Sequence, residues 1–441
     1  MAWNRREFLA LLAAGVAGVH AQARPPQRRP DGLIFAEEDK TGFSILQGMT
    51  DETSAQFSLV LPKNIPWSVT VQRSDGLHAP LAIQQEIFAR EYSDFAVYRL
   101  LVEGLELRTN YVLSVSDVTG HVHDRREFRA LDLSPRSVRL GFVSCALDIL
   151  HRDDIYVQLE QQNPDMIFFL GDNVYADRVT VFKKRNADER QLWTRYVETR
   201  NRVRLYYQKR LTPVLATWDD HDFGRNNGTR EFPHREAARI CFETFFPQTE
   251  RPALQNGPGI AKRFIGFGAD FYLLDGRYFR DNPALRERKL LGATQEKWLF
   301  SKVDPGKASW LLNGSMFFGA YTGKDSFEGV YANDFQSFKD KLRASDGLFC
   351  FGSGDVHFSE VMDLEEDLLG YKSFEMVSSS IHSMAIPGHE MRFSNPRRRR
   401  ATGHHNFTVF DGVFYPDRVE GSLTAFSAAR KVYTTPAWLA R

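Results

Sequence analysis

The sequence predicts an α/β protein preceded by a small all-β domain, and three observations support this. Residues 42–131 contain short strand-like runs separated by turn residues, as in an antiparallel sandwich. From Arg136 onward, apolar strand-like runs alternate with helical stretches, which is typical of an α/β fold. Four of these later runs end at clusters of residue types that bind metal ions.

The first 41 residues are expected to lie outside the fold. Residues 1–23 have the pattern of a twin-arginine signal peptide, with the pair Arg5-Arg6, a weakly apolar stretch and a small-residue cleavage site ending at Ala23. The apolar stretch is short, so we expect no stable membrane anchor after signal removal. Residues 24–41 are predicted to form a basic, Pro-rich linker. The sequence therefore predicts export by the twin-arginine machinery to the periplasm or the exterior.

Composition and charge narrow the class of protein. The chain is 42% hydrophobic and 26% charged, which is ordinary for a globular protein. Its formal net charge of +1 gives no signature of nucleic-acid or anionic-membrane binding. Three cysteines are too few, and odd in number, for a disulfide framework. Cys241 and Cys350 lie in apolar runs and are expected to be buried thiols, whereas Cys145 follows the end of a strand-like run.

The all-β domain, residues 42–131, is expected to have a structural or positioning role. Its predicted strands are 56–61, 67–71, 96–102 and 110–115. Residues 105–111 resemble the E–F corner of a fibronectin type III-like module. We therefore predict a fibronectin- or immunoglobulin-like sandwich.

The second part of the chain, residues 136–441, alternates strands and helices. Its predicted strands are 138–143, 166–170, 214–217, 271–274, 309–312, 348–352, 374–378 and 407–410. Its predicted helices are 155–161, 188–205, 235–245 and 294–300. Near the end, 422–426 and 431–433 favour strands over a long helix. The four arginines at 397–400 are expected in a solvated loop, with a phosphate clamp as the alternative.

Four strand-like runs end at residue types that bind metals. The residues at these ends are Cys145, then Asp172 with Tyr175, then Asp219, Asp220, His221 and Asp222, and finally Asp355 with His357. Open α/β sheets gather ligands at the carboxyl ends of their strands. Thiolate, carboxylate, phenolate and imidazole groups converging there indicate two bridged metal ions of the kind used in ester hydrolysis.

Individual positions within these clusters suggest roles. Asp172 lies where a carboxylate shared by two cations would lie, although a turn aspartate is the alternative. A phenolate at Tyr175 suits a ferric ion, and a packed aromatic ring is its alternative. Asp355 and His357 are two residues apart, so in extended backbone their side chains would point the same way.

Taken in order, the motifs resemble one known family. They read Ser-Cys, Gly-Asp-x-x-Tyr-Ala-Asp, Trp-Asp-Asp-His-Asp, Leu-Asp-x-Arg-x-Phe-Arg and Gly-Asp-Val-His. This order resembles the PhoD-like family of alkaline phosphatases, metallophosphoesterases related in fold to purple acid phosphatases. The resemblance covers roughly residues 136–410. It implies that residues 136–441 form a metallophosphoesterase-type β-sandwich core flanked by helices, in an αββα arrangement.

The resemblance also implies a metal-binding role for six side chains. Cys145, Asp172, Tyr175 and His357 would hold Fe³⁺, with Asp172 bridging to a second cation. Asp220 and Asp355 would bind that second cation, expected to be Ca²⁺ because calcium prefers hard oxygen ligands.

Two further side chains are implied to be catalytic. His221 would donate to the phosphoryl oxygen or leaving group, and Arg277 would hold the phosphate with its planar guanidinium. Asp219, Asp275 and Asn313 are additional candidates for metal or phosphate contact. The family usually has Gly-Asn-Gln after the strand that precedes Asn313, whereas this chain has Leu312-Asn313-Gly314-Ser315. The second metal's ligand there could be Asn313 or Ser315, or could be missing.

The activity implied is metal-dependent hydrolysis of phosphoric esters, with metal-bound hydroxide attacking phosphorus. The closest alternative is a phosphodiesterase or phospholipase that acts on lipid or wall polymer, because the motifs do not separate monoesters from diesters. A second alternative is a non-catalytic exported surface protein with a degenerate phosphatase domain. A third is a structural calcium-binding protein, for which the mixture of Cys, Tyr and His would have no use.

Overall fold

The computed structural model describes residues 42–440, apart from 151, 181–182, 320 and 322–324. The predicted signal peptide, 1–23, and linker, 24–41, lie outside the described residues. Residues from Gly42 onward belong to one structural unit. Within the described part of the chain, no helix combines the length and the apolar character needed to cross a membrane.

The N-terminal strands form two antiparallel sheets that share one hydrophobic core. The strands are β1 (Ser44–Thr50), β2 (Ser54–Pro62), β3 (Ser68–Arg73), β4 (Ile83–Ala89), β5 (Phe95–Glu103), β6 (Asn110–Ser116) and β7 (Val122–Arg129). Their orders are β1-β2-β5-β4 and β3-β6-β7. The Phe128 ring packs against Phe57 and Tyr111 at centroid distances of 4.8 and 5.5 Å. Tyr111 Oη also accepts a 2.8 Å hydrogen bond from the Glu106 amide, which ties down the predicted corner.

A six-stranded sheet carries the first three predicted clusters. Its strands are β8 (Ser137–Val143), β9 (Met166–Leu170), β10 (Val214–Thr217), β19 (Phe407–Phe414), β20 (Arg418–Phe426) and β21 (Lys431–Ala440). The order is β10-β9-β8-β19-β20-β21, and β8, β9 and β10 are parallel. The last two strands confirm the expected strand structure near the C-terminus.

An eight-stranded sheet carries the remaining cluster. Its strands are β11 (Leu254–Asn256), β12 (Lys262–Gly266), β13 (Ala269–Leu273), β14 (Ala308–Leu312), β15 (Leu348–Ser353), β16 (Ser359–Leu364), β17 (Ser373–Val377) and β18 (Arg398–Thr402). Strands β13, β14, β15 and β17 are parallel neighbours. The prediction of a solvated loop at 397–400 is wrong for most of these residues, because Arg398 onward forms β18, which pairs with β16. Arg398 lies 2.7 Å from the buried carboxylate of Glu360, which supplies the charge partner that lets this basic strand pack.

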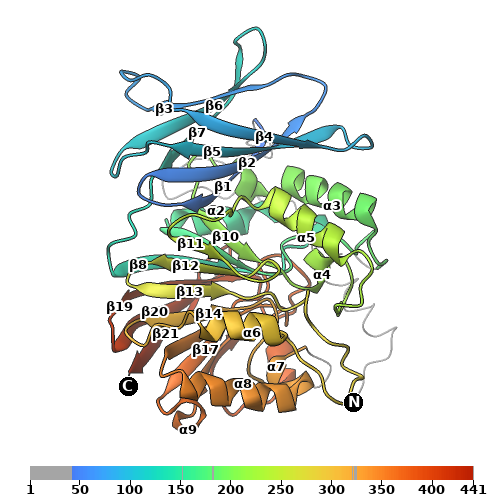
Figure 1. The fold of residues 1–441 in the computed structure, drawn as a ribbon, viewed down its shortest axis with the longest axis vertical. Coiled ribbons are helices and arrows are strands. Elements are labelled where there is room, and N and C mark those ends of the chain that lie inside the picture. The colour runs from blue at the N-terminus through green and yellow to red at the C-terminus, as the bar shows by residue number, and fades with distance from the viewer. Residues whose placement is uncertain (1–41, 151, 181–182, 320, 322–324, 441) are drawn as a thin grey trace. The chain divides into compact units, whose positions relative to one another are not determined.

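Helices cover the outer faces of the two large sheets (Figure 1). They are α2 (Asp153–Gln161), α3 (Glu189–Arg202), α4 (Asp220–Phe223), α5 (Arg235–Phe245), α6 (Ala293–Phe300), α7 (Phe327–Val330), α8 (Ala332–Ala344) and α9 (Glu366–Leu369). Between the sheets, Phe142 stacks on Trp310 at 5.1 Å, and Phe168 stacks on Phe271 at the same distance. These aromatic pairs join strands of both sheets and fix the positions of their carboxyl ends.

Arg200 of α3 connects the N-terminal sheets to the rest of the fold. Its guanidinium is buried and donates to Ser44 Oγ at 3.0 Å, to Ser58 Oγ at 2.7 Å and to the Phe245 carbonyl at 3.0 Å. Burial lowers the pKa of Arg200 to about 10, partly opposed by Tyr206. The cation is therefore held by neutral oxygens from β1, β2 and the end of α5.

Replacing Arg200 with Met should destabilise the protein by more than the loss of its apolar stem. Each buried acceptor left without a donor costs about 1–3 kcal/mol. The free energy of unfolding, measured by urea titration, should therefore fall by several kcal/mol. The control is Arg202→Met on the same helix, which should cost less because the Arg202 side chain is half-exposed and its partner Asp148 keeps a second ion pair with Arg195. Equal losses in the two variants would contradict this role for Arg200.

Candidate active site

Parallel strands of both large sheets end at the same place. Asp172 comes two residues after β9, Asp219 two residues after β10, and Cys145 two residues after β8. Asn313 follows β14 directly, and Asp355 follows β15 by two residues. Because the carboxyl ends of parallel strands meet at one edge, loops from the two sheets can face each other there.

Cys145, Asp172 and His357 form the first group of potential metal ligands. One ligand atom from each lies within 4.8 Å of the others. The Cys145 thiol is 3.7 Å from Asp172 Oδ2 and 3.2 Å from Ser379 Oγ. Burial, reinforced by the neighbouring Asp172 carboxylate, raises the pKa of this thiol well above its usual value. A bound cation would reverse that shift, because it stabilises the thiolate.

Tyr175 reaches the same group. Its Oη lies 3.3 Å from His357 Nε2 and donates to Ser383 Oγ at 2.9 Å. Its ring stacks on His221 with a centroid distance of 4.1 Å. Burial and the nearby Cys145 raise the pKa of Tyr175 well above its usual range, so a cation is again the group that would release the phenolic proton.

Asp172, Asp220 and His221 form a second group within 4.8 Å of one another. Asp172 is the member that both groups share, as the bridging role requires. The His221 amide donates to Asp172 Oδ1 at 3.2 Å, and the Asn227 amide donates to Asp220 Oδ2 at 2.6 Å. Asp220 Oδ1 is buried and has no hydrogen-bond donor in the described part of the chain. An acceptor of this kind fits a cation ligand.

His221 is held by a residue that the sequence analysis missed. Its Nδ1 lies 2.7 Å from Asp177 Oδ1, and both side chains are buried. Burial alone would lower the pKa of His221, but the carboxylates of Asp220, Asp172 and Asp177 outweigh it and raise the pKa to about 10. The available signal was the final letter of Gly-Asp-x-x-Tyr-Ala-Asp, because Asp177 ends that motif.

Asp219 and Arg277 pair with each other rather than pointing into solvent. Arg277 is 0% exposed, and its Nε lies 2.5 Å from Asp219 Oδ1. Its other nitrogens lie 3.1 Å from Asp325 and 2.9 Å from Ser315 Oγ. Burial would lower the pKa of Arg277, but Asp219 and Asp325 raise it well above its usual value. The sequence analysis missed Asp325, which follows a segment without a recognisable motif.

Asp275 and Asn313 have different surroundings. Asp275 accepts from Trp218 Nε1 at 2.7 Å and from the amides of Ile260 and Arg277, so its oxygens already hold the loops together. Asn313 donates to the Ser315 carbonyl at 2.7 Å, while its buried Oδ1 has no donor among the described residues. Asn313 is therefore the better placed of the two to offer an oxygen to a cation.

Asp355 and His357 do not lie on extended backbone, so the reason given for their common orientation is wrong. Their φ values are +69° and +61°, in the left-handed region, as are those of Cys145 and Asp172 at +57° and +54°. The strand β15 ends before them, and the alternation of a strand no longer applies. His357 still reaches the first group, and Asp355 lies near enough for its charge to raise the pKa of Cys145. Left-handed non-glycine residues are strained, and such strain concentrates at functional sites.

Asp222 holds the loops that carry the ligands. Its carboxylate accepts from the amides of Asp219 at 3.0 Å, Val174 at 2.9 Å and Asn173 at 3.2 Å. Asp219 and Asp222 thus form the capping box at the start of α4. The other two residues of the cluster, Asp220 and His221, have ligand atoms close to Asp172. Burial raises the pKa of Asp222 to about 7, although the amides oppose the shift.

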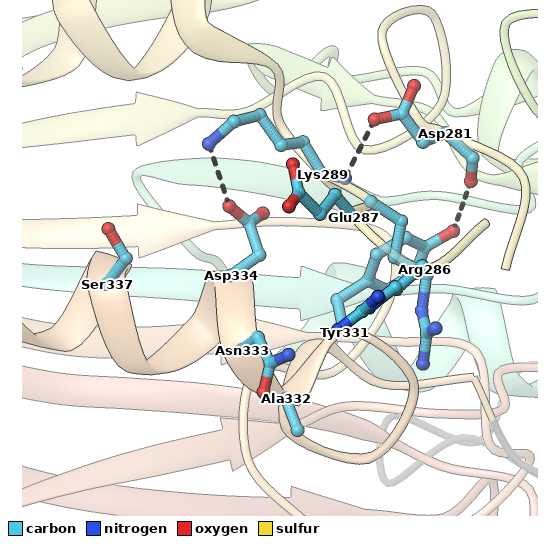
Figure 2. Close-up of a pocket in the computed structure, with 10 residues that line it drawn as sticks. Asp281, Arg286, Glu287, Lys289, Tyr331, Ala332, Asn333, Asp334 and Ser337 are labelled. Atoms are coloured by element: carbon cyan, nitrogen blue, oxygen red, sulfur yellow. Dashed lines mark hydrogen bonds and ion pairs between the residues drawn. The ribbon is translucent and has the colours of Figure 1, made fainter.

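A pocket of about 430 Å³ is lined by residues that include Asp281, Lys289 and Asp334 (Figure 2). Tyr331 lines it, and Tyr331 Oη accepts from Arg280, which pairs with Asp325. Lys289 and Asp334 of this pocket pair with each other at 3.1 Å. The predicted site residues are absent from the residues that line it. It touches the far end of the Arg277 network and is separate from the ligand groups.

Fold and site define a mixed α/β protein whose converging side chains are of metal-ligating types. The model of the PhoD-like phosphatase family matches residues 140–415, and the chain belongs to this family. Alkaline phosphatase D of Bacillus subtilis (strain 168) is 25% identical over 276 residues. That match spans 53% of this chain and about half, 47%, of the relative. A solved structure described as "Structure of PhoD" shares the fold, with a TM-score of 0.69 at 18% identity over 90% of this chain and 92% of that chain.

Asp222→Ala should both destabilise the protein and change its pH dependence. A buried acid with a raised pKa binds its proton more tightly in the folded state, so the contribution of Asp222 to stability is fully present below about pH 4 and is lost as pH rises toward 7. At about 1.4 kcal/mol per pKa unit, this loss amounts to roughly 4 kcal/mol. Urea unfolding at several pH values should show the loss in the wild type and a shallower dependence in Asp222→Ala. Parallel pH profiles would contradict the assignment.

Proposed function

We propose that this chain hydrolyses phosphoric esters with the help of two bound cations. The observation that carries the proposal is the sharing of Asp172 by two ligand groups, in a chain of the PhoD-like phosphatase family. Two cations sharing one carboxylate can approach to about 3.5–4 Å, the spacing of two-metal hydrolases. The relative from Bacillus subtilis is an alkaline phosphatase D by its name, which supports the same reaction class.

The two groups of potential metal ligands offer different donor atoms, and we propose a different metal ion for each group. Sulfur, phenol oxygen and imidazole around Cys145, Tyr175 and His357 suit Fe³⁺. Carboxylate and amide oxygens at Asp220, Asp355 and Asn313 suit Ca²⁺. When bound, such cations supply a nucleophile from water at moderate pH and neutralise charge on the phosphoryl oxygens.

The chain's own residues would manage the proton on the leaving group. Asp177 holds Nδ1 of His221, which leaves Nε2 as the ring nitrogen that would donate a proton to the departing alkoxide. Asp219 and Asp325 hold the buried guanidinium of Arg277 in place, and Arg277 is the residue that the sequence assigns to the phosphate. A phosphodiesterase or phospholipase acting on lipid or wall polymer remains the second candidate, since the same groups serve either ester.

The remaining assignments are proposals of the same kind. The two large sheets with helices outside them support a metallophosphoesterase core in residues 136–441. The strand orders and the Tyr111 hydrogen bond support a fibronectin- or immunoglobulin-like domain in residues 42–131. Export by the twin-arginine route, to the periplasm or beyond, rests on the sequence of residues 1–23. A non-catalytic surface protein is disfavoured, because a degenerate site would not need Cys145, Tyr175 and His221 buried together.

Tyr175→Phe should remove the phenolate that we propose for iron. The purified wild type should be coloured by a phenolate-to-iron transition, and the variant should lose that band together with most of its activity. Loss of one ligand or its support typically lowers metal affinity by about 10–100-fold. Tyr272→Phe is the matched control, because its buried hydroxyl bonds the Lys302 carbonyl in the sheet. A colourless, iron-free but active wild type would refute the iron assignment.

His221→Ala should lose activity while iron stays bound. Removing a general acid costs roughly 10²–10⁴-fold in rate. The loss should be smaller for nitrophenyl esters than for alkyl esters, because nitrophenol departs without a proton. Asp177→Asn should show the same trend at about 10–100-fold, as expected for a residue that orients another. Losses independent of the leaving group, or loss of iron in proportion to activity, would show that His221 acts as a ligand only.

A further inference from the structure

Arg277, the residue that the sequence analysis predicted to hold the phosphate, is poorly accessible. Arg277 has no exposed surface, and its guanidinium is shared by Asp219, Asp325 and Ser315. A substrate phosphate could reach it only by breaking a buried ion pair, which costs several kcal/mol. Its charge can act at a distance, but a phosphoryl oxygen at the cations needs a nearer donor.

An antiparallel bridge beside the ligand groups offers such a donor. Arg178 and Lys184 face each other in an antiparallel bridge, and the Arg185 amide donates to the Asp177 carbonyl at 2.8 Å. Residues directly opposite in such a pair place their side chains on the same face. Arg178 directly follows Asp177, whose carboxylate holds His221. Its position is therefore tied to the proposed general acid.

Contacts of these two cations place them against the acidic centre. Arg178 is buried, with its guanidinium carbon 6.0 Å from the centroid of the Tyr175 ring. Lys184 is exposed, and its ammonium donates to Asn226 Oδ1, next to the Asn227 amide that binds Asp220. Burial, together with the neighbouring Arg178, lowers the pKa of Lys184, although the carboxylates of Asp177, Asp220 and Asp172 oppose the shift. An exposed ammonium thus lies next to the loop that binds Asp220.

We propose that Lys184, backed by Arg178, binds the phosphoryl oxygens of the substrate and selects dianionic monoesters over monoanionic diesters. This rests on the proposed function. The Lys184 ammonium donates to the neutral amide oxygen of Asn226. A phosphate oxygen can replace this acceptor at the cost of a hydrogen bond to a neutral group. Coulomb attraction scales with the charge of the substrate. The positive charges of Lys184 and Arg178 therefore favour the ester that carries two negative charges. The site's substrate class would then be phosphate monoesters.

The test compares two substrates and four proteins. Wild type, Lys184→Ala, Lys184→Arg and Lys183→Ala are assayed at pH 8 with 4-nitrophenyl phosphate and bis(4-nitrophenyl) phosphate. The monoester is a dianion there, because the second phosphate pKa is about 6. Lys183 is the matched control, because it is the neighbouring lysine in the sequence and is also exposed. Metal content and inhibition by inorganic phosphate are measured on the same preparations.

Lys184→Ala should lower kcat/KM for the monoester by about 10–100-fold, the worth of one hydrogen bond to a charged group. The diester should lose only about 3–10-fold, half as much on a logarithmic scale, because it carries half the charge. Inhibition by phosphate should weaken as for the monoester, metal content should not change, and Lys184→Arg should recover most of the loss. Lys183→Ala should match the wild type.

Three results would overturn the inference. Equal losses for the two esters would remove the selectivity, and a fall in metal content would make Lys184 a support for Asp220. A Lys184→Ala protein as active as Lys183→Ala would remove the binding role. In each of these cases the wild type still hydrolyses an ester, so the proposed function stands. A metal-loaded wild type that hydrolyses neither ester would overturn the proposed function, and this inference with it.

Discussion

The buried carboxylate of Asp172 is the constraint on which the rest of the site depends. It is almost fully buried, lies against Cys145 on one side and against the His221 amide on the other, and burial raises its pKa well above the usual value. Asp220 Oδ1 adds a buried oxygen without a donor among the described residues. Acidic groups this crowded are costly unless cations neutralise them. Two cations, one in each group, would remove that cost.

The fold sets the positions of the loops that carry the ligands, and strained backbone in those loops sets the orientation of the ligand side chains. Stacked rings such as Phe142 on Trp310 lock the two large sheets face to face, so that loops after β8, β9, β10 and β15 meet. Cys145 and Asp172 then adopt left-handed backbone, which turns their side chains toward each other. Such conformations cost about 1–3 kcal/mol each and persist only where surrounding contacts enforce them. The amides bound to Asp222 are part of that enforcement.

Sequence analysis predicted many of the strands and the residues that gather at their ends, because both are local signals, but it missed strands such as β1, β4 and β7. A run such as 166–170 followed by Gly-Asp contains its own evidence, and β9 has those bounds. Asp325 and Ser379 were missed because their roles depend on partners far along the chain; Ser379 is 234 residues from Cys145. Asp177 ends a recognised motif, but only the fold shows that its partner is His221. The arginines of β18 were assigned to a loop for the same reason, since only the fold shows that Arg398 has the buried Glu360 as its partner. The left-handed turn at Asp355 and His357 likewise has no local signature.

The central claim, that one carboxylate joins two cation sites, is tested most directly by counting metal ions. Purified wild type and Asp172→Asn are compared by elemental analysis, with Asp188→Asn, which alters the exposed N-cap of α3, as the control. The account predicts two ions for each wild-type and control chain, and loss of both together in Asp172→Asn, because each site loses the ligand they share. An Asp172→Asn protein that keeps both ions, or that loses only one of them, would contradict it.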